Sequence, residues 1–449
     1  MNIDDQNEYT ASVAAHNRLA HQTHVVLRLG QYMLTAGASA YRVQDGMQRL
    51  ARAVGIEKLH VQVNYTSISA TAWANGTFRS EVVEQRNHGV NADKIDRFNA
   101  YIQGLPPSGL MVEDAEEDIE KIHTRKLLYS NVVSALASGA ACAGFTFLNL
   151  GGIVECLSVF FAAMIGQYSR KKLLAKHYNH FFVWMVCGFV ASGVYTGIVV
   201  LLHAAGLIDA SHQAGMVCAV LFLVPGFPLV TSILDLIRQD FSAGISRGAY
   251  VVMLLISTAT AVWAFSEIAD WGIMDVHAGY SLSFVGLMIG RALATFVAAY
   301  GFAMLFNAPP LACLLAAFNG AFINVARLTV KDFGMNPIAA VGLAALVAGL
   351  IAHVLSRKSH YSRVTLSVPA VVVMIPGVPL YRAMSAMTNG QDISNALDSI
   401  LTLLFIITSI GFGLATARIL TDRNWRVEKL PTVPTIGHLD SANINNFLA

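Results

Sequence analysis

The sequence LVPGFPLV at residues 223–230 places Pro-Gly-x-Pro-Leu in the middle of a long apolar run. The pattern recurs 151 residues later, as MIPGVPLY at residues 374–381. Proline removes a backbone donor and its ring clashes with the preceding helical turn, so each copy should break the helix that carries it. Two matching breaks inside apolar runs therefore predict a paired feature of a membrane protein.

Composition separates a polar segment from an apolar one. The 449-residue chain is 55% hydrophobic and only 13% charged, whereas soluble domains carry about 25% charged residues. Residues 1–125 hold 27 of the 58 charged residues, so we expect a soluble segment followed by a membrane domain. The net charge of +2 gives no sign of nucleic-acid binding, and the N-terminus lacks the apolar core of a signal peptide.

The five cysteines all fall inside apolar runs, and the histidines show no metal-ligand spacing. The cysteines therefore read as small membrane residues and not as disulfides or metal ligands. We expect no metal site and no cofactor.

A membrane span needs about 20 predominantly apolar residues, and the chain contains ten such runs. They are residues 127–148, 152–169, 182–205, 213–237, 246–267, 281–306, 309–327, 337–356, 364–387 and 394–418. The expected fold class is therefore mainly α, a polytopic membrane protein with ten transmembrane helices after a small α+β domain.

Loop charges predict the orientation of these spans. One set of alternate loops carries lysine and arginine repeatedly. It comprises 170–177, 238–247, 356–363 and the tail from residue 418, together with the tight loop 307–310, which has neither residue. The other loops together hold one lysine, Lys331. Positive loops face the cytoplasm, so we expect both termini to be cytoplasmic in a multi-pass protein of the inner (plasma) membrane. A miscount by one pair of spans would leave both termini inside.

The Pro-Gly-x-Pro-Leu copies occupy the fourth of five spans in each half of the membrane domain. Gly144, Phe145 and Arg170 also have counterparts 157 residues later, which indicates a duplicated unit. Five spans is an odd number, so two units in series must face opposite ways, as in secondary transporters. The expected divisions are a cytoplasmic α+β domain (1–125), two inverted five-helix repeats (126–268 and 280–420) and a cytoplasmic tail (421–449).

Two breaks at the same depth would form a polar site near the bilayer midplane. The candidate substrate-binding residues at the breaks are Pro225, Gly226, Pro228, Pro376, Gly377, Pro379 and Tyr381. The alternative is a pair of structural kinks whose backbone groups are satisfied by neighbouring helices.

Ionisable residues in the spans are few and therefore informative. Arg291 and Arg382 are candidates to bind a substrate carboxylate, although Arg291 could instead extend to the membrane interface. The candidates to carry a coupling proton or bind an ammonium group are Asp235, Asp240 and Glu155. Asp235 is also a candidate to bind substrate. The alternative for Asp240 is an ordinary interface charge.

The first 125 residues predict a small α+β domain. We expect helices at 12–35 and 39–54, strands within 59–73 and 76–84 joined by a turn at Asn75-Gly76, a helix capped by Asn91, and an acidic helix at 113–122. No nucleophile elbow, P-loop or zinc spacing occurs in this segment.

Several separated motifs resemble the threonine/serine exporter (ThrE) family. Residues 28–56, 87–104 and 223–250 are similar to its N-terminal part, and residues 301–328 with 369–384 are similar to its smaller partner domain, here fused. Asp235, Asp240 and Gly244 match the family pattern around the first break. The resemblance implies export of threonine and serine, with protons as the coupling partner, and split relatives imply a dicarboxylate such as succinate as the alternative substrate.

Two other function classes stay open at this stage, a membrane-anchored enzyme and a sensor that uses the soluble segment. Anchoring needs neither ten spans nor a duplicated break, so we expect a transporter and not an enzyme. Its partners would be a small molecule, protons and the lipid bilayer. The sequence leaves the oligomeric state, including a homo-oligomer, open.

Overall fold

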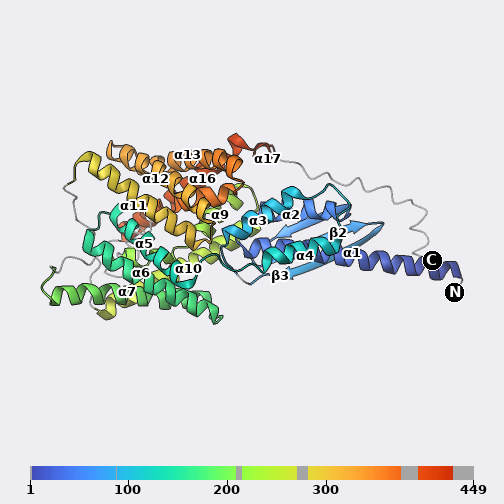
Figure 1. Cartoon of the computed structure of the whole chain (residues 1–449), viewed down its shortest axis with the longest axis horizontal. Coiled ribbons are helices and arrows are strands. Elements are labelled where there is room, and N and C mark those ends of the chain that lie inside the picture. Colours follow the sequence, from blue (N-terminus) through green and yellow to red (C-terminus); the bar gives the residue numbers. More distant parts are fainter. Residues whose placement is uncertain (1–2, 87, 209–214, 270–281, 376–392, 428–449) are drawn as a thin grey trace.

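The fold is seen in a computed structural model, which describes residues 3–86, 88–208, 215–269, 282–375 and 393–427. The molecule is elongated, with an α+β unit at one end and a helical bundle at the other (Figure 1). We call residues 3–123 the soluble unit, after the expectation from the sequence, which the structure does not test.

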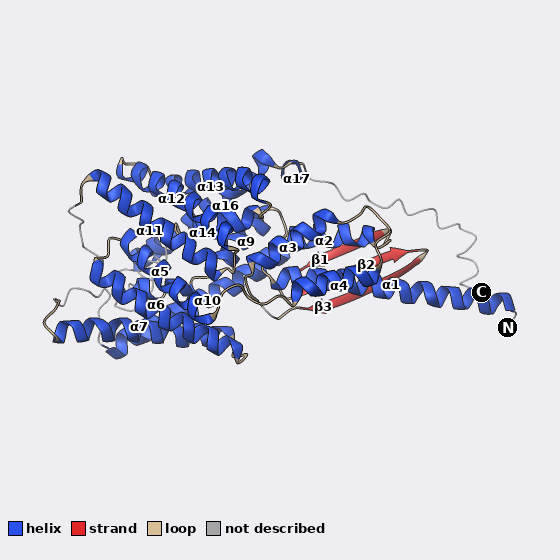
Figure 2. Ribbon diagram, viewed as in Figure 1, coloured by secondary structure: helices blue, strands red, loops and turns tan. Residues whose placement is uncertain are grey.

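The soluble unit is a three-stranded antiparallel sheet packed against helices (Figure 2). Its elements are α1 (Ile3–Thr35), α2 (Ala40–Ala53), β1 (Lys58–Val63), β2 (Ser67–Ala74), β3 (Thr77–Glu84), α3 (Ala92–Gly104) and α4 (Val112–His123). Asn75 and Gly76 have φ of 50° and 72°, as a two-residue hairpin turn requires. The predicted α+β character of this segment is confirmed.

The boundaries differ in two places from the sequence prediction. The first helix starts at Ile3 rather than at residue 12. The run 59–73 is two strands and not one, because the backbone N–H of Asn64 donates to the carbonyl of Ser67 at 2.8 Å and turns the chain. The predicted cap is present: the side chain of Asn91 accepts from the N–H of Lys94 at 3.1 Å.

The bundle follows in two groups of helices. The first half consists of α5 (Asn131–Leu148), α6 (Ile153–Ala175), α7 (His180–Ala204), α8 (Gly215–Ala219), the 3-10 turn η1 (Leu221–Leu223), α9 (Gly226–Ile237) and α10 (Phe241–Ala269). The second half consists of α11 (Phe284–Leu305), α12 (Pro310–Asp332), α13 (Pro337–Ser359), α14 (Arg363–Val372) and α16 (Ile393–Thr421), followed by the short α17 (Arg423–Arg426).

Among the described residues, seven helices are long and apolar enough to cross a membrane, or eight if the pair α8–η1 and α9, bent by 62°, counts as one span. The chain is therefore a multi-pass membrane protein. The count is lower than ten for two reasons. Helix α6 carries Glu155 at its start and three basic residues at 170–172 near its end, and α14 is only ten residues long. The rest of the predicted span 364–387 extends beyond the described residues.

The helix boundaries of the first half recur in the second. Both ends of α6 lie 157 residues before the ends of α12, and α7 starts 157 residues before α13. Helices α10 and α16 are each 29 residues long and are offset by 152 residues. The local chemistry recurs as well, because Asn179 and Asn336 cap α7 and α13 through their side chains.

Helices α5 and α11 cross at glycine. A Cβ added to Gly144 would lie 2.6 Å from the carbonyl oxygen of Ala294, and one added to Gly301 would lie 2.6 Å from the carbonyl oxygen of Ala137. Gly144 of α5 lies against Ala294 of α11, and Ala137, earlier in α5, lies against Gly301, later in α11. The two helices therefore run antiparallel, at backbone contact distance.

Candidate functional site

The first break lies between η1 and α9, where proline interrupts the helix. Neither Pro225 nor Pro228 has an N–H to donate, so carbonyls in the preceding turn need other donors. The N–H of Val224 donates to the carbonyl of Leu221 at 3.1 Å, and the N–H of Gly226 donates to the carbonyl of Val224 at 2.8 Å. Two carbonyls of this turn, those of Phe222 and Leu223, remain for side chains.

Side chains from α6 and α7 bind those two carbonyls. Arg170 donates from Nη1 to the carbonyl of Phe222 at 3.1 Å, and Trp184 donates from Nε1 to the carbonyl of Leu223 at 2.7 Å. The freed backbone groups of this break are therefore satisfied by neighbouring helices. This arrangement is the one expected of the structural-kink alternative, and any ligand at this site must use other groups.

Arg170 has donors left over. Its guanidinium carries five N–H donors, and its buried Nε has no hydrogen-bond partner among the described residues. The guanidinium lies 5.1 Å from the ring of Trp184 and 5.8 Å from that of Phe222. Within the described part of the chain, no carboxylate forms an ion pair with it.

A cavity of about 220 Å³ opens beside Arg170. The soluble unit contributes Tyr65, His88 and the two residues after it, and the first half contributes Lys171, Tyr250 and residues 222–225, with Pro228 behind them. The volume is smaller than the roughly 300–1,000 Å³ of drug-sized sites. The cavity therefore suits a small metabolite that has an anionic group.

Aromatic and imidazole rings form the wall on the side of the soluble unit. The rings of Tyr65 and His88 stack with centroids 4.2 Å apart, and Nδ1 of His180 lies 2.6 Å from the hydroxyl of Tyr250. Burial lowers the pKa of His88 to about 4, and the positive charge of nearby Arg247 acts in the same direction. His88 is therefore neutral at pH 7, and the cationic groups lining the cavity are Arg170 and Lys171.

A buried ion pair joins the soluble unit to the end of the first break. Asp235 and Arg247 are each 1% exposed, with Arg247 Nη1 3.6 Å from Asp235 Oδ2. Asp235 Oδ1 accepts the N–H of Ala40 at 3.1 Å, and Arg247 donates to the carbonyl of Ala38 at 2.8 Å. Both charges are thus committed to the turn that precedes α2.

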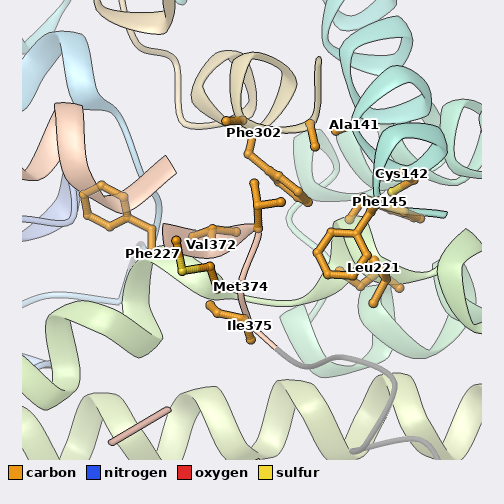
Figure 3. Close-up of a cluster of buried hydrophobic side chains, with 14 of the residues drawn as sticks. Ala141, Cys142, Phe145, Leu221, Phe227, Phe302, Val372, Met374 and Ile375 are labelled. Carbon is orange, nitrogen blue, oxygen red and sulfur yellow. The ribbon is translucent and has the colours of Figure 1, made fainter. Parts of the chain in front are cut away.

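The first break lies against the residues that precede the second Pro-Gly-x-Pro copy. A Cβ on Gly226 would lie 2.8 Å from Val372 and 3.2 Å from Ile375, which directly precedes the second Pro-Gly-x-Pro copy. Figure 3 shows Phe227 of the first break beside Val372, Met374 and Ile375. The predicted residues Pro376, Gly377, Pro379, Tyr381 and Arg382 lie outside the described residues.

The other predicted residues lie apart from the cavity. Arg291 pairs with Asp332 at 2.5 Å, where the aspartate side chain is 44% exposed. Asp240 accepts from the side chain of Gln44 at 3.3 Å, and burial raises the pKa of its carboxyl. Glu155 is buried at the start of α6. None of these three carboxylate or guanidinium groups lines the cavity beside Arg170.

Arg170, Trp184 and His88 were not predicted as site residues from the sequence. Arg170 appeared there only as a marker of the internal repeat. Its unusual position, an arginine that ends an apolar run, was the available signal. The contributions of Tyr65 and His88 come from folding the soluble unit onto the bundle and have no local sequence signal.

Comparison with known proteins agrees with the two-part organisation. Residues 24–268 match a sequence model described as "Putative threonine/serine exporter", and residues 291–420 match one described as "Threonine/Serine exporter, ThrE". No solved structure matches the chain.

Individual relatives fall into two groups. The threonine/serine exporter of Corynebacterium glutamicum is 22% identical over 90% of this chain and 81% of its own length. The "Probable threonine/serine exporter" of Mycobacterium tuberculosis is 21% identical over 88% of this chain and 75% of its own. The "Probable succinate transporter subunit YjjP" of Klebsiella aerogenes is 25% identical, over 56% of this chain and 94% of its own. The chain therefore belongs to the threonine/serine exporter (ThrE) family, in a form that fuses both of its parts.

Proposed function

We propose that this protein exports threonine and serine, or close analogues, through the cavity beside Arg170. The observation that carries the proposal is the guanidinium of Arg170, which lines a small cavity at a helix break and has unused donors. Two relatives named as threonine/serine exporters cover most of the chain. An exporter must bind its substrate from the side of the membrane where the substrate is made.

The cavity chemistry fits an amino acid. The substrate carboxylate would bind Arg170, because guanidinium and carboxylate form charge-assisted hydrogen bonds. The ammonium group would lie against the rings of Tyr65 and Tyr250, which attract cations through their faces. The apolar wall of Leu254 and Phe302 suits a small side chain and excludes a long charged one.

We further propose that the two halves are inverted five-span repeats that give alternating access. Support comes from the recurring helix boundaries, from the antiparallel crossing of α5 and α11, and from the contact of Gly226 with the residues before the second break. The repeats would be residues 126–268 and 280–420, and together they would cross the inner membrane ten times. Residues 1–125, the tail 421–449 and the basic loops would then lie in the cytoplasm. The soluble unit contacts loops of that basic set at Asn307 and Ser362.

Proton coupling is proposed at the carboxylates of the first half. Asp235 is 1% exposed and faces Arg247, so protonating it would weaken the link between the first break and the soluble unit. Asp240 lies five residues later and binds Gln44 of the soluble unit. Glu155 stays a candidate to carry the coupling proton, at the end of α6 opposite to Arg170.

A dicarboxylate is the second candidate substrate. Lys171 lines the same cavity as Arg170 and would supply a second cation. The relative named as a succinate transporter subunit covers 56% of this chain.

Counterflow in proteoliposomes of the purified protein separates the two candidates. Liposomes loaded with unlabelled threonine should accumulate labelled threonine and serine but not labelled succinate, and an imposed pH gradient should change the rate. Accumulation of succinate alone would replace the amino-acid proposal with the dicarboxylate one.

A further inference from the structure

A second cavity, of about 440 Å³, lies between the soluble unit and the second half. One wall comes from α2 and α3, including Tyr41 and Asn99. The opposite wall comes from the turn between α13 and α14, the end of α16 and the start of α17, including His360 and Trp425. The cavity shares no lining residue with the one beside Arg170.

Arginine dominates the charges of this second cavity, which we call the arginine cavity. Its lining holds five arginines, Arg42, Arg49, Arg357, Arg363 and Arg418, and two aspartates, Asp45 and Asp422. Asp45 is already paired with Arg49 at 2.9 Å, and Asp422 accepts the backbone N–H of Asn424 at 3.0 Å. Asp422 also attracts Arg363 and Arg418 electrostatically. Two carboxylates are still fewer than five guanidinium groups, so the lining keeps a net positive charge.

Four of the five arginines have no ion pair within the described ranges. Arg357 is exposed, and the other three are at least half-buried. Arg418 is 9% exposed, and its guanidinium lies 5.0 Å from the ring of Trp425. Among the described residues, Arg363 donates to the hydroxyl of Thr421, at 2.9 Å. The buried Nη1 of Arg42 has no hydrogen-bond partner in the part of the chain described here.

Two carboxylates outside the lining attract these arginines without forming ion pairs with them. Asp235 attracts Arg418 but is paired with Arg247. Asp96 attracts Arg42 electrostatically but forms no ion pair with it. Its Oδ1 instead accepts from the N–H of Ser362 and the hydroxyl of Thr365, both at 2.9 Å. Buried charges in proteins are paired or bind ions. Three guanidinium groups with no ion pair among the described residues, one of them buried and two half-buried, therefore call for an anion.

We propose that the arginine cavity binds a small phosphoryl-bearing anion with at least two negative charges. The planar fork of a guanidinium matches phosphate oxygens in a bidentate manner, and the volume falls within the roughly 300–1,000 Å³ of small-molecule sites. The anion would bridge Arg42 of the soluble unit to Arg363 and Arg418 of the second half. Its binding would hold the soluble unit against the membrane helices, independently of the transported substrate.

The test measures the melting temperature of the full chain in lipid-free detergent against inorganic pyrophosphate, at constant ionic strength. Pyrophosphate should raise the melting temperature in a saturable way. Arg42→Gln and Arg363→Gln should each weaken its apparent affinity by about tenfold or more. Arg52→Gln, an exposed position on the same helix α2, should leave the affinity unchanged.

Removing one of three mutually repelling charges should not lower the melting temperature without pyrophosphate, so the variants stay interpretable. A parallel titration uses cardiolipin, whose headgroup carries two phosphates, in the same detergent. The anion that gives the arginine-dependent shift shows whether the site takes a lipid headgroup or a soluble phosphate. The proposal is overturned if neither anion shifts the melting temperature, if Arg42→Gln and Arg363→Gln respond like the wild type, or if succinate binds there more tightly. Threonine counterflow is measured separately, so failure here leaves the transport proposal standing.

Discussion

Gly144 and Gly301 lie 157 residues apart, and each packs against the helix that carries the other. Gly144 on α5 contacts the backbone of Ala294 and Ala298 on α11, and Gly301 on α11 contacts Ala137 and Ala141 on α5. The two α11 residues, Ala294 and Ala298, lie 157 residues after the two α5 residues, Ala137 and Ala141. The crossing is therefore symmetric under exchange of the two halves, as a two-fold axis between them would require.

This symmetry predicts matched effects of substitution at the two glycines. Gly144→Ala and Gly301→Ala should each lower stability by about 1–3 kcal/mol, because the new methyl group meets a backbone carbonyl that cannot move away easily. The measurement is the melting temperature of each variant in detergent.

Gly197 on α7 supplies the control, because a Cβ there meets nothing within 4 Å. Gly197→Ala should be neutral or stabilising, by up to about 1 kcal/mol of helix propensity. Unequal losses at Gly144 and Gly301, or a loss at Gly197 as large as theirs, would argue against a symmetric crossing.

The buried pair of Asp235 and Arg247 should hold the soluble unit in place. Asp235→Ala leaves an unpaired buried arginine, which costs about 3–5 kcal/mol, and it removes the acceptor for the N–H of Ala40. Limited trypsin digestion should then cut faster at Arg125 and Lys126, which follow the last helix of the soluble unit.

A double substitution, Asp235→Leu with Arg247→Met, separates docking from charge burial. It should be less damaging than Asp235→Ala, since replacing both members of a buried pair leaves no unpaired charge. Glu117→Ala breaks an exposed pair with Lys121 and should not change the digestion rate. If Asp235→Ala were digested like the wild type, the pair would have no role in docking.

Asp96 and His88 should give opposing pH dependences of stability. Burial raises the pKa of Asp96 to about 6, against hydrogen bonds from Ser362 and Thr365 and the charge of Arg42. Between pH 3.8 and about 6 the folded protein holds a proton that the unfolded chain has lost. The contribution of Asp96 to the free energy of unfolding is therefore present at low pH and is lost as pH rises to about 6. The pKa of His88 is lowered to about 4. Its contribution to the free energy of unfolding is therefore present above pH 6.5 and is lost as pH falls below 6.5.

In the wild type, the opposite changes of stability with pH from Asp96 and His88 should largely offset each other. With Asp96→Asn the melting temperature should rise with pH between about 4 and 6.5, and with His88→Gln it should fall over nearly the same range. His16→Gln, exposed on α1, should keep the wild-type profile. Identical profiles for all four proteins would mean that neither group changes its pKa on folding.

Much of this fold could be predicted from local sequence patterns. Apolar run length located the long bundle helices to within several residues but did not indicate the short α17. Asn75-Gly76 marked a turn through its backbone conformation, and Asn91 marked a cap through its side chain. The subdivision of the run 59–73 was missed, because the turn at residues 64–66 contains neither glycine nor proline. The repeat was visible because Pro-Gly-x-Pro is rare within apolar runs.

The candidate site could be predicted only in part. Pro225 and Pro228 mark the break and also line the cavity. The partners of the break, Arg170 and Trp184, come from other helices, and their contacts depend on tertiary packing. Arg291 was selected for its depth in an apolar run, yet its ion pair with Asp332 places it away from the cavity.

The most direct test of the account is threonine binding to the purified full chain, compared between the wild type and Arg170→Gln. Loss of the guanidinium–carboxylate contact should weaken binding by about tenfold or more. Lys172→Gln, an exposed cation two residues further along α6, should bind as the wild type does. Equal affinities of the wild type and Arg170→Gln, with both proteins folded, would contradict the assignment of this cavity to the substrate.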